Sequence, residues 1–296
     1  MRQKIKYTLA FFLLLALLFG VAVHFVAPYA IVQPPRIQED LQPADLQLSS
    51  EELALRTEEG FPLAAYWIKS ARDSVRGLII LVHGIGGCKE HFLPLAKELA
   101  QQGIETVVFD GRAHGRSGGE FCTFGYQEKK DISRIVDYIR QQQPDLKIGI
   151  WGNSLGGAIA IQALEIEQRI EFGIIESTFT RLDQIVYDYQ QRLSMGLGKR
   201  WLSDHALRRA GALAQFDPQK VRPIESVRHL HQALFLAHGD RDENISVTYG
   251  QALFDQLASP QKELFIVPGG GHFDLFLQGG APYKNALFHF INQQLP

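Results

Sequence analysis

A short glycine-flanked motif around one serine is the strongest chemical signal in the chain. It reads Gly152-Asn153-Ser154-Leu155-Gly156, follows an apolar run at 148–151 and opens a helix-like stretch at 154–167. Glycine on both sides allows a sharp bend from strand to helix, because no Cβ atom obstructs it. The bend holds the serine hydroxyl clear of the backbone, beside unpaired N–H groups of a helix N-terminus. The motif predicts that Ser154 is a nucleophile, although a plain glycine-rich turn reads the same locally.

A serine nucleophile needs a base, and the base needs an acid that orients it. His272 ends a glycine-rich sequence directly after the apolar run 264–267, so a loop can carry its ring over a sheet edge. Asp242 lies in a carboxylate-rich turn after the run 234–237. The chain order serine, aspartate, histidine occurs with serine turns of this kind. We therefore predict that Ser154, His272 and Asp242 act together as nucleophile, base and acid.

Three other carboxylates near the ends of predicted strands are alternatives to Asp242. Asp240 and Glu243 belong to the same turn, where they are equally typical of a solvated turn and a helix start. Glu176 follows the run 174–175, and that strand end faces the same edge of the sheet.

Attack by serine produces an oxyanion, which backbone N–H groups usually stabilise. The N–H of Leu155, the residue after the serine, is one expected donor. The other is expected from the glycine-rich loop 83–87, where we choose the N–H of Ile85. His83 in that loop and His114 further along are interpreted as structural hydrogen-bonding residues rather than as a second base.

The elements that must position these residues alternate along the chain. Continuous apolar runs are typical of buried parallel strands, and apolar residues at i, i+3 and i+4 are typical of helices. The alternation predicts an α/β protein with a mainly parallel central sheet and helices on both faces. An opening hairpin is expected from 53–57 and 63–69. Further strands are expected at 78–82, 106–109, 148–151, 174–175, 234–237 and 264–267, and helices at 91–102, 127–142, 154–167 and 283–293.

The alternation breaks between residues 181 and 213. Leu182, Ile185 and Tyr189 recur at helical spacing, glycines interrupt at 196 and 198, and a second helical stretch follows from Trp201. We expect a small helical insertion over 181–213. It is either a lid over the site that sets acyl-chain preference or an ordinary pair of connecting helices, and the sequence leaves both open.

The N-terminal segment has the composition of a membrane anchor. Arg2, Lys4 and Lys6 precede a stretch, 7–35, without Asp, Glu, Lys or Arg. A helix of about 20 residues rises roughly 30 Å, the thickness of a bilayer core. We predict an uncleaved transmembrane helix at 7–28. A cleaved signal peptide, which would give a secreted protein, and a buried core helix are the alternatives.

The charges beside this segment predict its orientation and the domain boundaries. The flank 1–6 has three basic side chains, and the flank after the span has only Arg36, followed by Glu39, Asp40 and Asp45, which favours a cytoplasmic N-terminus. Three prolines between 34 and 43 indicate an extended linker over 29–50. The remainder, 51–296, suits one large domain, which we expect outside the cytoplasm.

The composition excludes some function classes. The chain has 296 residues and a formal net charge of −2, with charges of both signs interspersed, so no nucleic-acid partner is expected. The Cys and His residues do not have the spacing of zinc ligands, and His229 and His231 alone are a weak signal. We therefore expect neither a bound metal nor a cofactor.

The two cysteines, Cys88 and Cys122, follow the third and fourth predicted strands. Those connections leave the same rim of a parallel sheet, and an extracytoplasmic domain would lie in an oxidising compartment, so a disulfide is one interpretation. Two free thiols in small packed sites are the other.

Four motifs together resemble the α/β-hydrolase superfamily. They are His83-Gly84, Asp110-x-Arg112-x-His114-Gly115-x-Ser117, Gly152-x-Ser154-x-Gly156 and His238-Gly-x-x-Asp242, and the match runs from about Leu53 to the C-terminus. The resemblance implies an α/β-hydrolase fold and hydrolysis of an ester, thioester or amide, with Asp242 as the acid. The sequence 175–180 and the N-terminal anchor resemble the membrane-anchored α/β-hydrolase-domain proteins and their bacterial relatives. That branch includes acyl-protein and lipid thioesterases.

These observations lead to one function and two alternatives. We expect a serine hydrolase that cleaves a carboxylic ester or thioester through an acyl-enzyme. A small-molecule or lipid-like acyl substrate is expected, because the anchor would hold the site near a bilayer. A serine peptidase or aminopeptidase-type amide hydrolase is the first alternative. A non-catalytic binding protein is the second, although such proteins usually lack the serine or the histidine.

Overall fold

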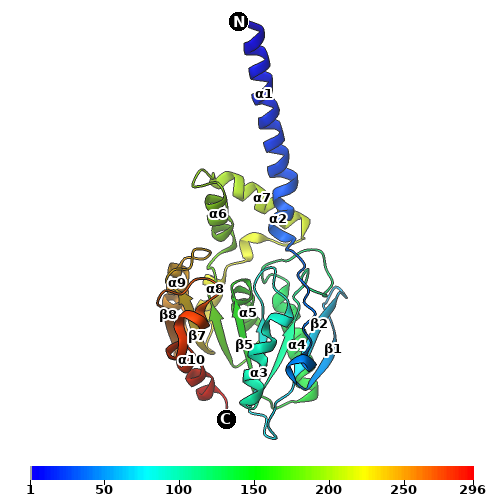
Figure 1. Ribbon diagram of the computed structural model, residues 1–296, viewed down its shortest axis with the longest axis vertical. Coiled ribbons are helices and arrows are strands. Elements are labelled where there is room, and N and C mark those ends of the chain that lie inside the picture. Colours follow the sequence, from blue (N-terminus) through cyan, green and yellow to red (C-terminus); the bar gives the residue numbers. More distant parts are fainter. Residues whose placement is uncertain (1) are drawn as a thin grey trace.

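The computed structural model describes residues 2–296, whose globular part is built on an eight-stranded sheet (Figure 1). β1 (Ser50–Arg56) and β2 (Pro62–Ile68) form an antiparallel hairpin at one edge, and β2 also pairs antiparallel with β4. The other strands run parallel in the order β4-β3-β5-β6-β7-β8. This confirms the predicted hydrolase-type α/β architecture with its opening hairpin. The parallel strands are β3 (Gly77–Val82), β4 (Ile104–Phe109), β5 (Ile148–Asn153), β6 (Phe172–Glu176), β7 (Ala233–Gly239) and β8 (Lys262–Val267).

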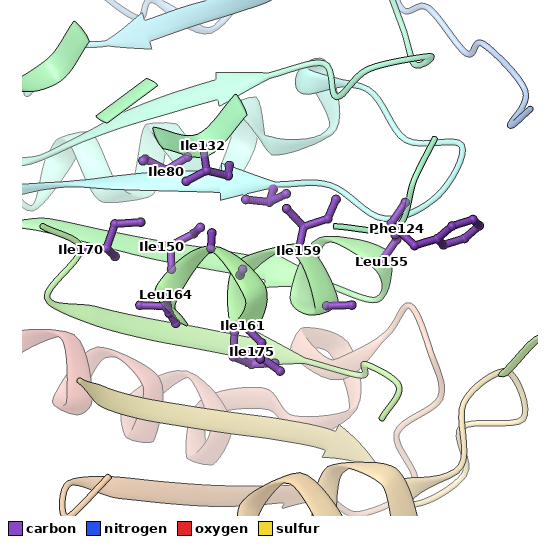
Figure 2. Close-up of a cluster of buried hydrophobic side chains, with 14 of the residues drawn as sticks. Ile80, Phe124, Ile132, Ile150, Leu155, Ile159, Ile161, Leu164, Ile170 and Ile175 are labelled. Carbon is purple, nitrogen blue, oxygen red and sulfur yellow. The ribbon is translucent and has the colours of Figure 1, made fainter. Parts of the chain in front are cut away.

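Helices cover both faces of the sheet, which explains why its strands are apolar throughout. Along β3, Leu78 and Ile80 contribute to one buried cluster, whereas Ile79 and Leu81 contribute to the other, because successive side chains of a strand point to opposite faces. Figure 2 shows the first cluster, with Ile80 beside Ile132. One face carries α3 (Leu93–Gln101) and α10 (Leu275–Gln294), and the other carries α4 (Glu128–Gln142), α5 (Leu155–Ile166), α8 (Pro223–Ser226) and α9 (Val247–Gln256).

Several helices differ from the sequence-based expectation. α8 and α9 were not among the predicted helices. α10 begins at Leu275 rather than at 283, and it is kinked at Gly280, whose φ of 50° and ψ of −143° are not helical. Pro282 follows the kink, so the sequence there resembles a loop although helix lies on both sides. The helix expected at 91–102 begins as a 3₁₀ turn, Lys89–Phe92, before α3.

The N-terminal helix projects from the globular part (Figure 1). It comprises α1 (Arg2–Val21), a π-helical turn (Ala22–Val26) and α2 (Ala27–Val32). Residues Gln3–Val32 form one helix, long enough to cross a bilayer, that contains an 18-residue window with a mean hydropathy of 2.7. A membrane span and a signal sequence both have these properties. The helix extends beyond the predicted span of 7–28.

The segment after this helix is docked on the globular part rather than free. Val32 is fully buried, and its carbonyl oxygen accepts the N–H of Cys122 at 2.8 Å. The guanidinium group of Arg36 donates to the carbonyl oxygen of Ser117 at 2.6 Å. Residues 33–42 have no helix or strand, whereas the linker predicted at 29–50 also includes the end of α2 and a 3₁₀ helix, Pro43–Leu46, and these contacts fix its path.

Candidate active site

Ser154 lies at the turn between β5 and α5, and its backbone has φ 54° and ψ −118°. A residue with a Cβ atom rarely adopts a positive φ, so the surroundings must hold it there. Two glycines make the turn possible. A Cβ atom on Gly152 would lie 2.1 Å from the carbonyl oxygen of Gly156, and one on Gly156 would lie 1.9 Å from that of Val82. On the other side, the N–H of Ser154 donates to the carbonyl oxygen of Glu176 at 2.9 Å.

The loops that follow β7 and β8 bring Asp242 and His272 to Ser154. Nε2 of His272 lies 3.0 Å from Oγ of Ser154, and Nδ1 lies 2.7 Å from Oδ2 of Asp242. Because a carboxylate only accepts, this network assigns the ring proton to Nδ1 and leaves Nε2 able to accept the serine proton. The structure thus brings the predicted nucleophile, base and acid into one hydrogen-bonded line, and all three are buried.

Asp242 is surrounded by donors that favour its ionised form. Its Oδ1 accepts the N–H groups of Asn244 and Ile245, each at 2.8 Å. Burial alone would raise the pKa of this carboxyl group, but hydrogen bonds from His238, His272 and the Ile245 N–H outweigh burial and hold the pKa well below its ordinary value. An ionised Asp242 can stabilise the imidazolium that forms when His272 takes the serine proton.

The three alternative acids have other surroundings. Asp240 accepts the N–H of Gly269 at 2.7 Å and so supports the loop that carries His272. Glu243 is exposed. Glu176 is buried and hydrogen-bonded to the hydroxyl of Tyr283, and burial raises its pKa. Within residues 2–296, the only carboxylate hydrogen-bonded to His272 is therefore that of Asp242.

The loop predicted to complete the oxyanion site lies against the serine turn. A Cβ atom on Gly84 would lie 3.3 Å from Cβ of Ser154. Ile85, the next residue, is half-exposed, and Leu155 is buried at the start of α5. The assignment of their N–H groups as oxyanion donors remains a prediction. The docked N-terminal segment supports this loop too, since a Cβ atom on Gly86 would lie 3.2 Å from Cγ of Pro35.

His83 and His114 both have structural hydrogen bonds. Nε2 of His83 accepts the N–H of Gly111 at 3.0 Å, and its Nδ1 lies 2.7 Å from the carbonyl oxygen of Gly84. Burial, followed by the neighbouring His114, lowers the pKa of His83 to about 4, so the ring is neutral at physiological pH. Nδ1 of His114 lies 2.9 Å from the carbonyl oxygen of Arg112. The bond from Gly111 to His83 and the contact between the two rings, whose centroids are 4.9 Å apart, connect the loops after β3 and β4.

A buried ion-pair network braces the same loops, and sequence reasoning missed its central lysine. Nζ of Lys89 is buried, 2.6 Å from Oε1 of Glu90 and 3.1 Å from Oδ2 of Asp110. Oδ2 of Asp110 also accepts the N–H of Arg116 at 2.9 Å. Nothing in the sequence around Lys89 distinguishes it from a surface lysine, because its partner is 21 residues away.

The predicted insertion consists of α6 (Leu182–Leu193) and α7 (Arg200–Leu213). It lies beyond the C-terminal ends of the parallel strands, which is the end of the sheet that carries the site (Figure 1). The guanidinium group of Arg192 donates to Oδ1 of Asn244 at 2.7 Å, next to the turn that holds Asp242. Arg200 joins the two helices through Oδ2 of Asp183 at 2.6 Å. The role of the insertion as a lid remains a prediction.

Cys88 and Cys122 are both buried free thiols, so the disulfide interpretation is wrong for this structure. Burial, then the neighbouring Glu90, raises the pKa of Cys88 to about 11, which keeps it a protonated thiol. Cys88 lies with Glu39 and His91 in a group whose potential metal-ligand atoms are within 4.8 Å of one another. Nε2 of His91 lies 3.0 Å from Oε1 of Glu39 in a hydrogen bond, so these two side chains already have a partner in each other.

Comparisons with known proteins agree with this architecture. A sequence model of a hydrolase family, described as serine aminopeptidase S33, matches residues 73–225. An uncharacterised protein of Bacillus subtilis, YqkD, is 22% identical over 253 residues, which cover 83% of this chain and 80% of that protein. The lysophosphatidylserine lipase ABHD12 of Bos taurus is 26% identical over 210 residues, 66% of this chain and 49% of the lipase.

Solved structures share the fold. An esterase of Pyrococcus furiosus superposes with a TM-score of 0.75 and 24% identity, covering 90% of this chain and 98% of the esterase. An acylaminoacyl peptidase of Pyrococcus horikoshii superposes with a TM-score of 0.64 and 16% identity, covering 84% of this chain but only 42% of the peptidase. At these identities the likeness extends to the fold.

Proposed function

Because this chain belongs to the serine aminopeptidase S33 family of α/β-hydrolases, we propose that it is a serine hydrolase of carboxylic esters or thioesters. Ser154, His272 and Asp242 form its catalytic triad. The observation that carries the proposal is the continuous hydrogen-bonded line through the three side chains, with distances of 3.0 Å and 2.7 Å. The strained serine turn, stabilised by two close glycine approaches, supports the same role.

The geometry supports an acyl-enzyme mechanism. Nε2 of His272 takes the proton from Oγ of Ser154 as the oxygen attacks the substrate carbonyl carbon. The N–H groups of Leu155 and Ile85 stabilise the oxyanion, and the imidazolium returns its proton to the leaving group. Water, activated by the same imidazole, then releases the acid and restores the serine. Asp242 stays ionised throughout and fixes the orientation of the ring.

We propose a lipid or acylated molecule as the substrate. Three observations support this choice: the apolar N-terminal helix, the apolar insertion at the edge of the site, and the likeness to a protein named as a lysophosphatidylserine lipase. An amide substrate is the second candidate, because the matching family is described as an aminopeptidase family. The same triad chemistry cleaves both bonds.

We also propose that α1 is a retained membrane anchor with a cytoplasmic N-terminus and an extracytoplasmic catalytic domain. A cleaved signal peptide, leaving a secreted enzyme, is the alternative. Retention is supported by the π-helical turn, where Nδ1 of His24 lies 3.0 Å from Nε2 of His205 on α7. Part of the apolar helix is thus docked on the catalytic domain, a contact that a cleaved leader would not need.

The test is a substrate panel with the full-length protein in detergent. It would contain p-nitrophenyl esters and acyl thioesters of increasing chain length, together with aminoacyl amides, and Ser154→Ala would be the control. We expect ester or thioester turnover and serine labelling by a fluorophosphonate in the wild type only. Amide turnover that exceeds ester turnover would replace the first candidate by the second. If the wild type shows neither serine labelling nor turnover of any substrate, both candidate functions are overturned.

A further inference from the structure

The connection between α6 and α7 carries large apolar side chains that face away from the protein. Leu193, Met195, Leu197 and Trp201 are 85%, 89%, 75% and 67% exposed. We call residues 193–201 the lid tip. Isolated exposed apolar residues are common, but four within nine positions form a patch of the kind that marks a binding surface.

The lid tip is not needed to hold the insertion in place. The inner sides of the two helices supply that packing through Leu182, Ile185 and Leu207, which are all buried. At the tip, Met195 and Gly196 both have positive φ, 51° and 84°. Glycine or asparagine would adopt this turn with less strain, so a methionine there is a costly way to build a loop.

The charge around the lid tip is positive. No Asp or Glu occurs from 189 to 203, and Arg192 and Lys199 fall within that stretch, whereas Arg200 is paired with Asp183 and Asp204. Arg192 lies over the ring of Tyr189 at 4.2 Å, and Lys199 is exposed. Apolar side chains bordered by cations are the composition of a surface that enters the interface of an anionic bilayer. Tryptophan in particular favours the level of the lipid headgroups.

The position of the lid tip relative to the N-terminal helix identifies what it meets. The α6–α7 connection lies at the end of the globular part from which the N-terminal helix projects (Figure 1). The helix and the lid are in direct contact, because His24 meets His205 of α7. A bilayer crossed by α1 would therefore lie directly against this end.

We propose that the lid tip inserts into the interface of the bilayer that holds α1, as a second membrane contact of the chain. This inference rests on the proposed function of a membrane-anchored hydrolase of lipid esters. It adds that the lid is held by lipid, so that the site opens toward an acyl chain that is still in the bilayer. A second copy of the chain or another protein on this patch is a competing occupant, which the experiment below distinguishes.

Tryptophan fluorescence can locate the lid tip, because Trp67 and Trp151 are fully buried and Trp201 is exposed. The full-length protein would be reconstituted into phosphatidylcholine–phosphatidylglycerol vesicles, with and without brominated acyl chains. We expect bromine to quench the wild type and to have no effect on Trp201→Phe. Emission that is quenched by aqueous acrylamide but not by bromolipid would overturn the proposal. If Trp201 is protected from both quenchers, and if this protection increases with the protein-to-lipid ratio, a second copy of the chain rather than the bilayer covers the lid tip.

Activity provides an independent readout. In the variant Leu193→Ser/Met195→Ser/Leu197→Ser, we expect at least a tenfold loss of turnover on a long-chain ester in the same vesicles. Turnover of a soluble short-chain ester in detergent should stay within twofold of the wild type. Ile166→Ser is the matched control, since Ile166 is 46% exposed at the end of α5 far from Ser154. Equal vesicle turnover in both variants would overturn the proposal.

The two experiments also separate this inference from the proposed function. A wild type that hydrolyses neither ester would overturn the proposed activity, whereas bromolipid quenching of Trp201 would still establish the membrane contact. A wild type that hydrolyses both esters without quenching would retain the activity and overturn the contact.

Discussion

His238 and Asp242 are joined at the back of the site: Nε2 of His238 lies 3.4 Å from Oδ2 of Asp242, the same oxygen that receives Nδ1 of His272. Nε2 of His238 is also 2.8 Å from the carbonyl oxygen of Ile245, so it must carry a proton. The acid of the triad is thus held by two histidines, one on the side of the serine and one on β7.

Replacement of His238 should therefore weaken catalysis without removing any reacting group. We expect His238→Ala to lower kcat/KM about tenfold, the effect of losing one hydrogen bond to a charged acceptor. His238→Gln, which keeps a donor, should recover part of the loss. The acidic limb of the pH profile should move in the alanine variant, because the carboxylate loses a donor. Equal losses in both variants with an unchanged profile would indicate a packing effect instead.

Ser154 and His272 should behave as one unit. Either alanine variant should lose roughly 10⁴- to 10⁶-fold in kcat, and the double variant should lose little more. Asp242→Asn should lower kcat by a smaller factor, roughly 10²- to 10⁴-fold, and Asp240→Asn by a smaller factor still. Steady-state kinetics on one ester would rank the four variants. A larger loss for Asp240→Asn than for Asp242→Asn would reassign the acid.

Glu176 should affect stability rather than chemistry. Since burial raises its folded-state pKa, the folded chain retains a proton that the unfolded chain loses above about pH 4.3. The contribution of this group to stability therefore declines as pH rises from that value through the folded-state pKa. Thermal denaturation would be measured at about pH 5 and at about pH 8. From the lower to the higher pH, the Tm of the wild type should fall relative to the Tm of Glu176→Gln. Turnover of Glu176→Gln should remain close to wild type, and a severe loss would contradict this role.

A reductant should not change the stability of the protein, because Cys88 and Cys122 are free thiols. Dithiothreitol should leave the Tm unchanged, and both thiols should react with a maleimide after denaturation without reduction. A disulfide closing this loop would contribute roughly 3 to 4 kcal/mol, so its reduction would lower the Tm by several degrees. Mass spectrometry of the alkylated protein measures the thiol count directly.

The buried side of the lid should set the acyl-chain preference. Leu207 on α7 belongs to the same apolar cluster as Leu155 and Ile159, which lie at and after the serine turn. We expect Leu207→Ala to shift the preferred p-nitrophenyl ester toward longer chains, and Leu207→Phe toward shorter ones. Leu253→Ala, in α9 of the same cluster, is the matched control. A similar shift in the control would place the preference outside the lid.

The sequence was sufficient for the parts of the site that depend on local chemistry. Gly152 and Gly156 mark the serine turn because no other residue fits there, and Asp242 and His272 follow apolar strands that are easy to recognise. The contact of Glu39 with His91 could not be foreseen, because it depends on how the docked segment crosses the domain. The disulfide argument failed for a similar reason. Two loops that leave one rim need not bring their Cα atoms within bonding distance.

The docking of residues 32–36 determines how far the site can travel. A free linker of about 20 residues would have an end-to-end distance of roughly 25 Å, so a tethered domain could move that far from its attachment point. Here the helix continues to Val32, which is fully buried, and Arg36 is bound to the loop beside the site. With α1 in a bilayer, Ser154 would stand at one fixed height above the lipid. Such an enzyme would encounter substrates by lateral diffusion in the bilayer. It would not hydrolyse an acyl group presented well above or below that height.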